Sequence, residues 1–151
     1  MALRVPTRQI GKCGELLVQL RLLLAGVESA PMTTDAGIDL VAYSPRRARP
    51  TTIQVKTNLN PKPAGGTGRP ALDWWVPEKC PADLIACVDL SQEQVWLFRP
   101  REFARLAQQH SGGRHHLYFY PDAGVGAPAA QAALASRFHR YLAEARIPAL
   151  F

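Results

Sequence analysis

The chain has few cysteines, and their spacing excludes two common kinds of site. Cys13, Cys80 and Cys87 are an odd number without CxxC spacing, so neither a disulfide framework nor a four-thiolate zinc centre can be built from them. The four histidines lack HxxxH and HExxH spacing, and adjacent His115 and His116 would point to opposite faces of a strand. We therefore expect buried structural thiols in a reducing cytoplasm and no histidine metal site.

Long apolar runs are also missing from the sequence. The runs at residues 22–25 and 84–88 are only four and five residues long, far short of the roughly 20 residues that span a bilayer. The N-terminal residues contain no apolar core followed by a small-residue cleavage site, so we expect no signal peptide. The 151 residues contain no internal repeat. This length predicts one domain over residues 1–151. Because long apolar runs and a signal peptide are missing, we expect a cytoplasmic protein with no membrane partner.

Positive charge, in contrast, is plentiful. The formal net charge is +6, the pI is about 9.7, and 14 of the 18 basic residues are arginine. This balance favours a polyanionic partner, because phosphate neutralisation releases counterions and supplies affinity. A GC-rich genome would produce the same bias towards alanine, arginine and proline, and net charge also keeps a protein soluble. Charge alone therefore favours nucleic acid only modestly.

The periodicity of apolar residues predicts a helix over residues 8–25. Gly11 and Gly14 each cost about 1 kcal/mol in a helix interior, which indicates close approach of the backbone to DNA or to a neighbouring strand. A simple N-terminal turn would also explain Gly11. Apolar residues recur along the helix at three- and four-residue steps and should form one buried stripe, made of Cys13, Leu16, Leu17, Leu20, Leu23 and Leu24.

Alternating and continuous apolar segments predict the strands. A polar turn after residue 90 predicts a hairpin, and the proline- and glycine-rich residues 58–72 are expected to be a loop. The order of elements is typical of an α/β or α+β fold with a mixed β-sheet flanked by helices. The predicted strands cover residues 37–43, 51–57, 83–90, 94–99 and 115–120, and two further helices are expected over 100–109 and 128–145.

Three polar residues on two neighbouring strands carry the first indication of chemistry. Gln54 and Lys56 point to the face opposite the apolar residues of their strand, and Asp39 likewise leaves the apolar face of the preceding one. Carboxylate and amide oxygens are ligands that Mg²⁺ prefers, and the ion activates water beside a phosphate. A lysine can orient that water or neutralise charge in the transition state. The pattern therefore suits phosphodiester hydrolysis.

At this point the chain resembles the PD-(D/E)xK nuclease superfamily. The resemblance rests on residues 11–15 (GKCGE), 34–39 (TDAGID) and 54–56 (QVK). It implies an α/β, restriction-endonuclease-like fold and a Mg²⁺-dependent DNA endonuclease in which Mn²⁺ can substitute. It further implies catalytic roles for Glu15, Asp39, Gln54 and Lys56, with Lys56 positioning the water. The metal ligands would be the first three of these residues and the main-chain carbonyl of Val55.

The glutamine departs from the usual acidic residue of the motif. In this respect the chain is most similar to small bacterial members of the superfamily, including a group I intron homing endonuclease, and archaeal Holliday junction resolvases are more distant. Gln54 adds no negative charge, so we expect weaker metal affinity or the loss of one metal position. Each residue also has an ordinary interpretation. Asp39 can form a hydrogen bond within a turn, and Glu15 can interact favourably with the positive N-terminal end of its helix. Gln54 and Lys56 can lie on an exposed strand face.

Several basic residues are candidates for DNA contact. Arg46, Arg47 and Arg49 occupy the turn between the two catalytic strands, where they can grip phosphates or form a solvated charged turn. Lys12, on the first helix, is assigned to DNA binding with them. Trp74 and Trp75 can stack on bases, although at least one of them is expected in the core.

Two other functions and two quaternary arrangements remain open at the level of sequence. The chain can be a nuclease-fold module that binds DNA or assembles without cutting, or a protein-interaction domain with an incidental basic surface. A nuclease that breaks both strands pairs two sites by symmetry, which predicts a homodimer or a tetramer. The apolar C-terminal residues 147–151 dock either on a partner or on their own core.

Overall fold

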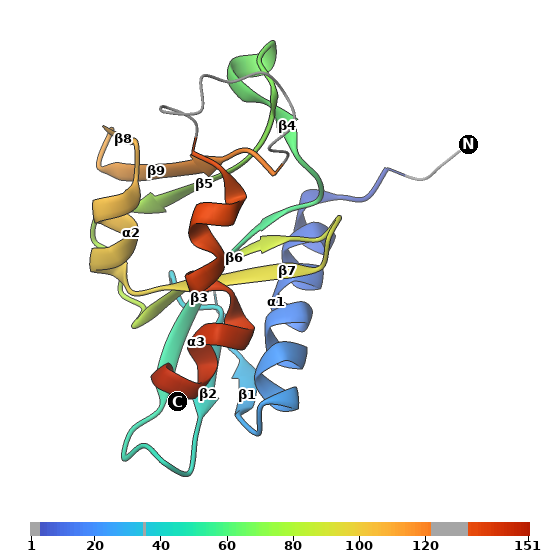
Figure 1. Ribbon diagram of the computed structural model, residues 1–151. Helices are drawn as coiled ribbons and strands as arrows, with labels where there is room; N and C mark the ends of the chain where they lie inside the picture. The colour runs from blue at the N-terminus through green and yellow to red at the C-terminus, as the bar shows by residue number, and fades with distance from the viewer. Residues whose placement is uncertain (1–3, 35, 122–132) are drawn as a thin grey trace.

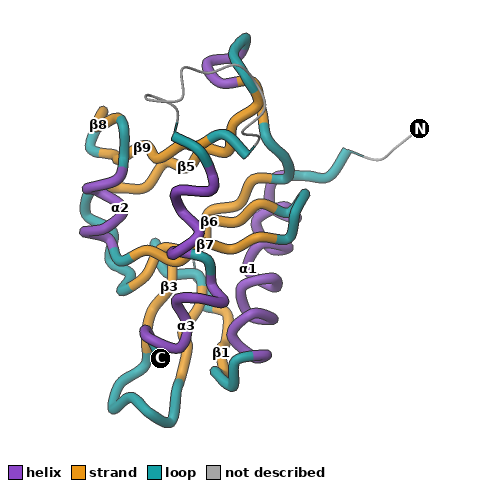
Figure 2. The backbone as a smooth tube through the Cα atoms, in the orientation of Figure 1, coloured by secondary structure: helices purple, strands orange, loops and turns teal. Residues whose placement is uncertain are grey.

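Two β-sheets form the framework of the computed structural model, which describes residues 4–34, 36–121 and 133–151 (Figures 1 and 2). The first sheet has the strand order β1-β2-β3-β6-β7, and the second has the order β4-β5-β9-β8. β3 pairs in parallel with β6, whereas the other pairs are antiparallel. The predicted α/β fold with a mixed sheet is therefore confirmed. The first sheet contains β1 (Glu28–Pro31), β2 (Leu40–Tyr43), β3 (Thr51–Asn58), β6 (Leu84–Asp89) and β7 (Gln94–Phe98).

The second sheet was the main feature missing from the sequence prediction. It consists of β4 (Lys62–Pro63), β5 (Pro70–Pro77), β8 (Gln109–Ser111) and β9 (Arg114–Phe119). The predicted loop over 58–72 is thus wrong in part, because β4, a 3₁₀ turn (η1, Ala64–Gly66) and the start of β5 lie within it. These pieces are short and rich in turn formers. β4 pairs with the start of β5, and β5 pairs with the distant β9, so tertiary pairing decides their conformation. β1 and β8, which were also not predicted, are short and largely exposed.

Helix α1 (Thr7–Leu24) has the predicted extent but not the predicted buried face. The row that packs on the sheet is Gly14, Val18 and Leu22. Leucines surround most of this helix, so its pattern is compatible with more than one stripe, and the small Gly14 allows the closest approach. Cys13 is exposed, Leu17 is partly buried, and the exposed fractions of Leu16, Leu20, Leu23 and Leu24 are 55%, 48%, 59% and 73%.

The core consists of two clusters on opposite faces of the first sheet. One lies between this sheet, α1 and α3, and it includes Leu40, Ile53 and Leu84. The other lies between the two sheets and includes Trp74, Trp96 and Phe119. β6 contributes to both clusters and is buried at every position, as its continuous apolar sequence predicts. One face of β2 and β3 is thereby committed to the first cluster, which leaves their other face for polar side chains.

The C-terminal part of the chain differs from the single helix predicted over 128–145. Residues 128–132 lie outside the described residues, and the remainder forms a 3₁₀ helix (η2, Ala135–Tyr141) and a short α3 (Ala143–Leu150). The extended backbone of Leu142 separates them. Ile147, Leu150 and Phe151 are buried in the first cluster, so the C-terminal residues dock on their own core. Helix α2 (Pro100–Leu106) is shorter than its prediction over 100–109. In the described ranges, none of the helices has the length and apolar character that a membrane crossing requires.

Candidate active site

Asp39 lies immediately before β2 and is fastened to β3 by two hydrogen bonds. Its main-chain N–H donates to the Ile53 carbonyl at 2.9 Å, and its Oδ2 atom accepts from the Val55 N–H at 2.6 Å. The strand predicted over 37–43 begins only at Leu40. Before that residue, the Asp39 side chain rather than a main-chain carbonyl accepts the hydrogen bond from the Val55 N–H. This arrangement fixes the position of a carboxylate beside the central strand of the candidate site.

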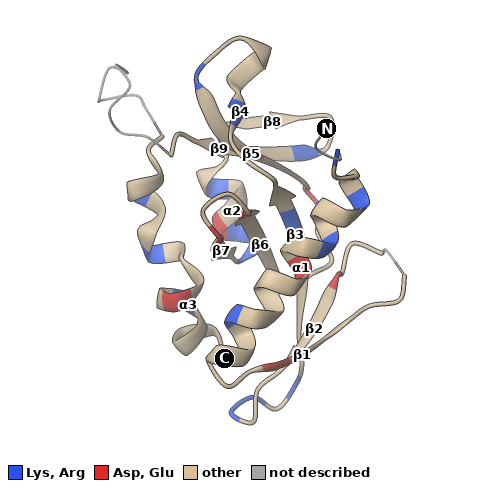
Figure 3. Ribbon diagram, turned by 90° about the vertical axis from the view of Figure 1, so that its right-hand side faces the viewer, with Lys and Arg blue, Asp and Glu red and all other residues tan. Residues whose placement is uncertain are grey.

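A groove of about 340 Å³ brings Asp39 together with Glu15. One wall is the N-terminal half of α1, and the other is the segment that leads into β2 (Figure 3). Arg8 and Lys12 line the same groove from α1. The groove therefore combines carboxylates from two elements with two cationic side chains, a combination that suits a phosphate and a divalent cation. Arg8 was not among the residues selected from the sequence.

The carboxylate of Glu15 is paired within its own helix. Lys12 Nζ lies 2.7 Å from Glu15 Oε2, and the exposed fractions of the two side chains are 51% and 21%. Because Lys12 is half exposed, its ammonium can leave this carboxylate at small energetic cost. Lys12 therefore offsets the negative charge of Glu15 in the groove, and its ammonium can also reach a phosphate bound there.

Gly14 explains how α1 comes close enough to β3 to deliver Glu15. A Cβ atom at Gly14 would lie 1.9 Å from the Thr57 Oγ1 atom, a distance that no packed structure tolerates. The sequence interpretation that this glycine permits close approach to a neighbouring strand is thus confirmed. Gly11 has no heavy atom within 4 Å of its notional Cβ among the described residues, so packing does not require glycine there.

Gln54 and Lys56 lie on the face of β3 opposite to Ile53 and Val55, as the alternation predicts. Ile53 belongs to the first core cluster and Val55 packs against it. Gln54 is only 5% exposed, and its Oε1 atom accepts a hydrogen bond from the Cys80 thiol at 3.6 Å. The amide oxygen proposed as a metal ligand is therefore already oriented by a neighbouring side chain.

Cys80 is a neighbour of the site that the sequence interpretation missed. Burial raises the pKa of its thiol; the hydrogen bond with the Ala82 main chain and the charge of Lys56 oppose this rise, and the charge of Asp39 adds to it. A raised pKa keeps the thiol protonated near neutral pH, which preserves the hydrogen bond to Gln54. No sequence signal marks Cys80, because only the packing of the turn after β5 brings it to β3.

The donor set fits a hard divalent cation only as a mixed set of ligands. Across residues 4–34, 36–121 and 133–151, no group of three or more His, Cys, Asp or Glu side chains could hold a metal ion. Two carboxylates, Asp39 and Glu15, share the groove, and amide, main-chain or water oxygens would have to complete the coordination. Such a set is typical of Mg²⁺, which usually retains several waters.

The arginines of the β2–β3 turn lie at the end of the hairpin away from Asp39. The turn is exposed, and two of its arginines contact their own chain: Arg47 donates to the Ala149 carbonyl at 3.1 Å, and Arg49 lies 3.5 Å from Asp83. Arg46 is also exposed. Five residues of extended chain span about 17 Å, so these side chains lie away from the site, and their contact with DNA stays a prediction.

Comparisons with known proteins bear on the fold. No protein-family model matches the chain, and no curated protein matches it in sequence. Among solved structures, the chain is similar to a bacterial homing endonuclease, I-Ssp6803I, with a TM-score of 0.50 and 15% sequence identity. The similarity covers 89% of this chain and 91% of that chain. It shows an α/β, nuclease-like fold that extends over nearly the whole of both chains.

Proposed function

We propose that this protein is a Mg²⁺-dependent endodeoxyribonuclease of the PD-(D/E)xK type, in which Mn²⁺ can replace Mg²⁺. The observation that carries the proposal is the groove that Asp39 and Glu15 share between α1 and the segment before β2. Support also comes from the hydrogen bond that holds Asp39 on Val55, from the basic net charge and from the nuclease-like fold. DNA is the expected substrate, because duplex phosphates complement the cationic groove wall.

The proposed roles follow from the chemistry of each side chain. Asp39 and Glu15, together with the Gln54 amide oxygen and the Val55 carbonyl, would hold the cation. When bound, Mg²⁺ polarises a phosphoryl oxygen and lowers the pKa of a coordinated water. Lys56 holds the attacking water and neutralises the negative charge that grows on the phosphate. The water oxygen bonds to phosphorus and one P–O ester bond breaks, which leaves a phosphate monoester and a hydroxyl.

Nicking of supercoiled plasmid DNA tests this proposal directly. We expect purified protein to convert supercoiled plasmid to open circles with Mg²⁺ or Mn²⁺ and not with EDTA. Glu15→Gln should abolish nicking, whereas Glu28→Gln, which removes an exposed carboxylate on β1, should not. Equal nicking by wild type and Glu15→Gln would remove this residue from the site. No nicking with either metal, over a range of DNA substrates, would contradict the proposed activity.

A second candidate function is a nuclease-fold module that binds or assembles on DNA without cutting it. One observation favours it: the residue in the acidic slot of the motif is an uncharged glutamine, and its oxygen is already bonded to Cys80. Such a module would bind duplex DNA with a strong salt dependence and leave plasmid intact with every divalent metal. The plasmid assay combined with a salt titration of binding therefore separates the two functions.

A further inference from the structure

The outer face of the second sheet carries polar and aromatic side chains. Its inner face packs in the core between the sheets through Leu72, Trp74 and Leu117. Because side chains alternate along a strand, the residues between them, including Trp75 and His116, lie on the opposite face. The registered pairs are Asp73 with Tyr118 and Trp75 with His116. This face is remote in sequence from the catalytic motif and has no part in the proposed hydrolysis.

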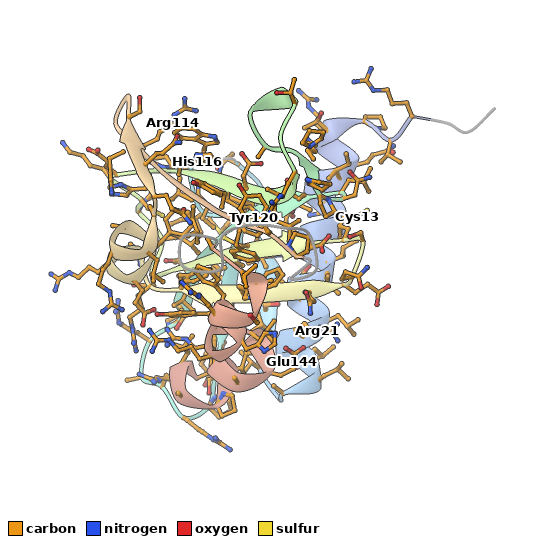
Figure 4. The ribbon with its side chains drawn as sticks, turned by 45° about the horizontal axis from the view of Figure 1, so that its top comes forward. Cys13, Arg21, Arg114, His116, Tyr120 and Glu144 are labelled. Carbon is orange, nitrogen blue, oxygen red and sulfur yellow. The ribbon has the colours of Figure 1, made fainter. Side chains whose placement is uncertain are left out.

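Four rings form a row along this face. Trp75 stacks on His116 with a centroid separation of 4.0 Å and an interplanar angle of 4°. Tyr118 follows at 5.5 Å from the His116 ring, and Tyr120 lies 6.2 Å from Tyr118. Figure 4 shows Arg114, His116 and Tyr120 in succession along β9. The guanidinium of Arg114 lies 5.0 Å from the centre of the Trp75 ring, which places a cation at one end of the row.

A cavity of about 480 Å³ opens over three of the four rings, but not over Trp75. Its lining includes Tyr118, Tyr120 and His116, together with Lys62, Asp73 and Gln109. This volume lies within the range of small-molecule sites. The ring faces suit a flat aromatic ligand, the Asp73 carboxylate can accept from an exocyclic amine, and Lys62 can meet a phosphate.

His116 is held in place by both of its ring nitrogens. Its Nε2 atom lies 2.9 Å from Asp73 Oδ2, and its Nδ1 atom lies 3.2 Å from Gln109 Oε1. Since neither nitrogen is available to a substrate, this His–Asp pair is unsuited to general base catalysis. The hydrogen bonds instead fix the plane of the imidazole against Trp75. The Trp75–His116 stack is therefore rigid and already occupied face to face, and the rings available to a ligand are those of Tyr118 and Tyr120, which line the cavity beside it.

We propose that this face binds single-stranded DNA by base stacking, on a single-stranded part of the same substrate. Alternate residues of a strand are about 6.6–6.8 Å apart, a spacing that an extended single strand can follow. Stacking on aromatic rings tolerates every base, and cations beside the rings hold the backbone. Arg114 and Lys62 supply those cations at the ends of the row. The inference rests on the proposed function for its substrate class.

Binding of a fluorescein-labelled dT12 oligonucleotide, measured by anisotropy in EDTA, tests the proposal. We expect wild type to bind dT12, and the double variant Tyr118→Ala/Tyr120→Ala to bind it on the order of tenfold more weakly. Tyr118→Phe/Tyr120→Phe keeps the rings and should bind like wild type. The matched control is Tyr43→Ala, an exposed tyrosine of β2, which should leave affinity unchanged. Equal affinity of wild type and the double alanine variant overturns the proposal.

A second measurement needs no substitution. Trp74 and Trp96 are 2% and 1% exposed, so the more exposed Trp75 reports on the outer face. We expect saturating dT12 to quench tryptophan fluorescence more strongly than a duplex of the same length. Unchanged fluorescence at saturation contradicts stacking at this surface. Because these assays contain no metal, a protein that stacks dT12 but never nicks plasmid refutes the nuclease alone, and the converse result refutes the stacking surface alone.

Discussion

Asp39 depends for its position on the Val55 N–H, which bonds to its Oδ2 atom at 2.6 Å. An asparagine oxygen can accept the same hydrogen bond, but it brings no charge to a metal. We therefore expect Asp39→Asn to fold with a stability within about 1 kcal/mol of wild type. Plasmid nicking should fall on the order of a hundredfold or more. Thermal unfolding and a nicking time course measure the two effects. If this variant nicks plasmid at the rate of wild type, the assigned chemistry is wrong.

Gln54→Glu adds a negative charge to the candidate site while it leaves the shape of the side chain nearly unchanged. Gln54 is 5% exposed, so a carboxylate there is desolvated, and we expect a loss of roughly 1–3 kcal/mol in unfolding free energy without metal. A nearby cation compensates that charge. Mn²⁺ should consequently raise the melting temperature of this variant more than that of wild type. Calorimetry that finds identical Mn²⁺ affinity for both proteins would place residue 54 outside the coordination sphere.

The residues of the candidate site were predictable to the extent that strand alternation determines them. Gln54 and Lys56 lie on the predicted face of β3 because period-two geometry holds in any regular strand. Cys80 was not predictable, since its contact with Gln54 depends on how the turn after β5 packs. The pairing of Lys12 with Glu15 follows from their separation on a helix, but the groove around them requires the tertiary structure.

Among the elements, α1 shows most clearly where a pattern is insufficient. Its extent was predictable from apolar periodicity, whereas its buried face was not, because leucines occupy several faces and only contact with the sheet decides among them. The pairing of β5 with β9 was likewise not predictable, because it joins segments about 40 residues apart in sequence. The strands β6 and β7, which are buried on both faces, were predictable from composition alone.

The packing of α1 on β3 gives a prediction at the scale of elements. Gly14→Ala places a Cβ atom against Thr57, so the helix must move outward or the threonine must rotate. We expect a loss of about 1–3 kcal/mol in unfolding free energy and lower nicking activity, since Glu15 moves with the helix. Gly11→Ala is the matched control: its Cβ atom meets no heavy atom of the described residues within 4 Å, and it should raise helix stability by about 1 kcal/mol. Urea denaturation of the two variants tests this contrast.

At the scale of the whole molecule, we propose that the exposed leucines of α1 form a surface for a second copy of the chain. Cys13, Leu16, Leu20 and Leu23 are exposed and are separated by 3, 4 and 3 residues, which is the spacing of a coiled-coil seam. α1 lies on the outer edge of the molecule (Figure 1). The α1 seam of a second copy has the same shape and the same lack of charge. A two-fold pair of α1 helices would therefore bury both seams.

We therefore expect homodimers through α1, and a tetramer if two such dimers associate. Leu20 is 48% exposed, so Leu20→Lys should shift the protein to monomer, and its melting temperature should no longer rise with protein concentration. Light scattering at micromolar to high micromolar concentration measures the change. Leu59→Lys, at an exposed leucine outside α1, should leave the mass unchanged. A wild-type protein that stays monomeric at high concentration, free and with DNA, contradicts this arrangement.

The unequal burial of β3 and of the segment before β2 has a consequence for the lifetime of the site. β3 pairs with the fully buried β6 over six registered residues, so Gln54 and Lys56 belong to a part that opens only when the whole domain unfolds. Asp39 precedes a four-residue strand whose neighbour β1 is mostly exposed. Breathing of that edge would release the carboxylate while the lysine stays in place. We therefore expect the proposed catalytic centre to be lost and regained many times between global unfolding events.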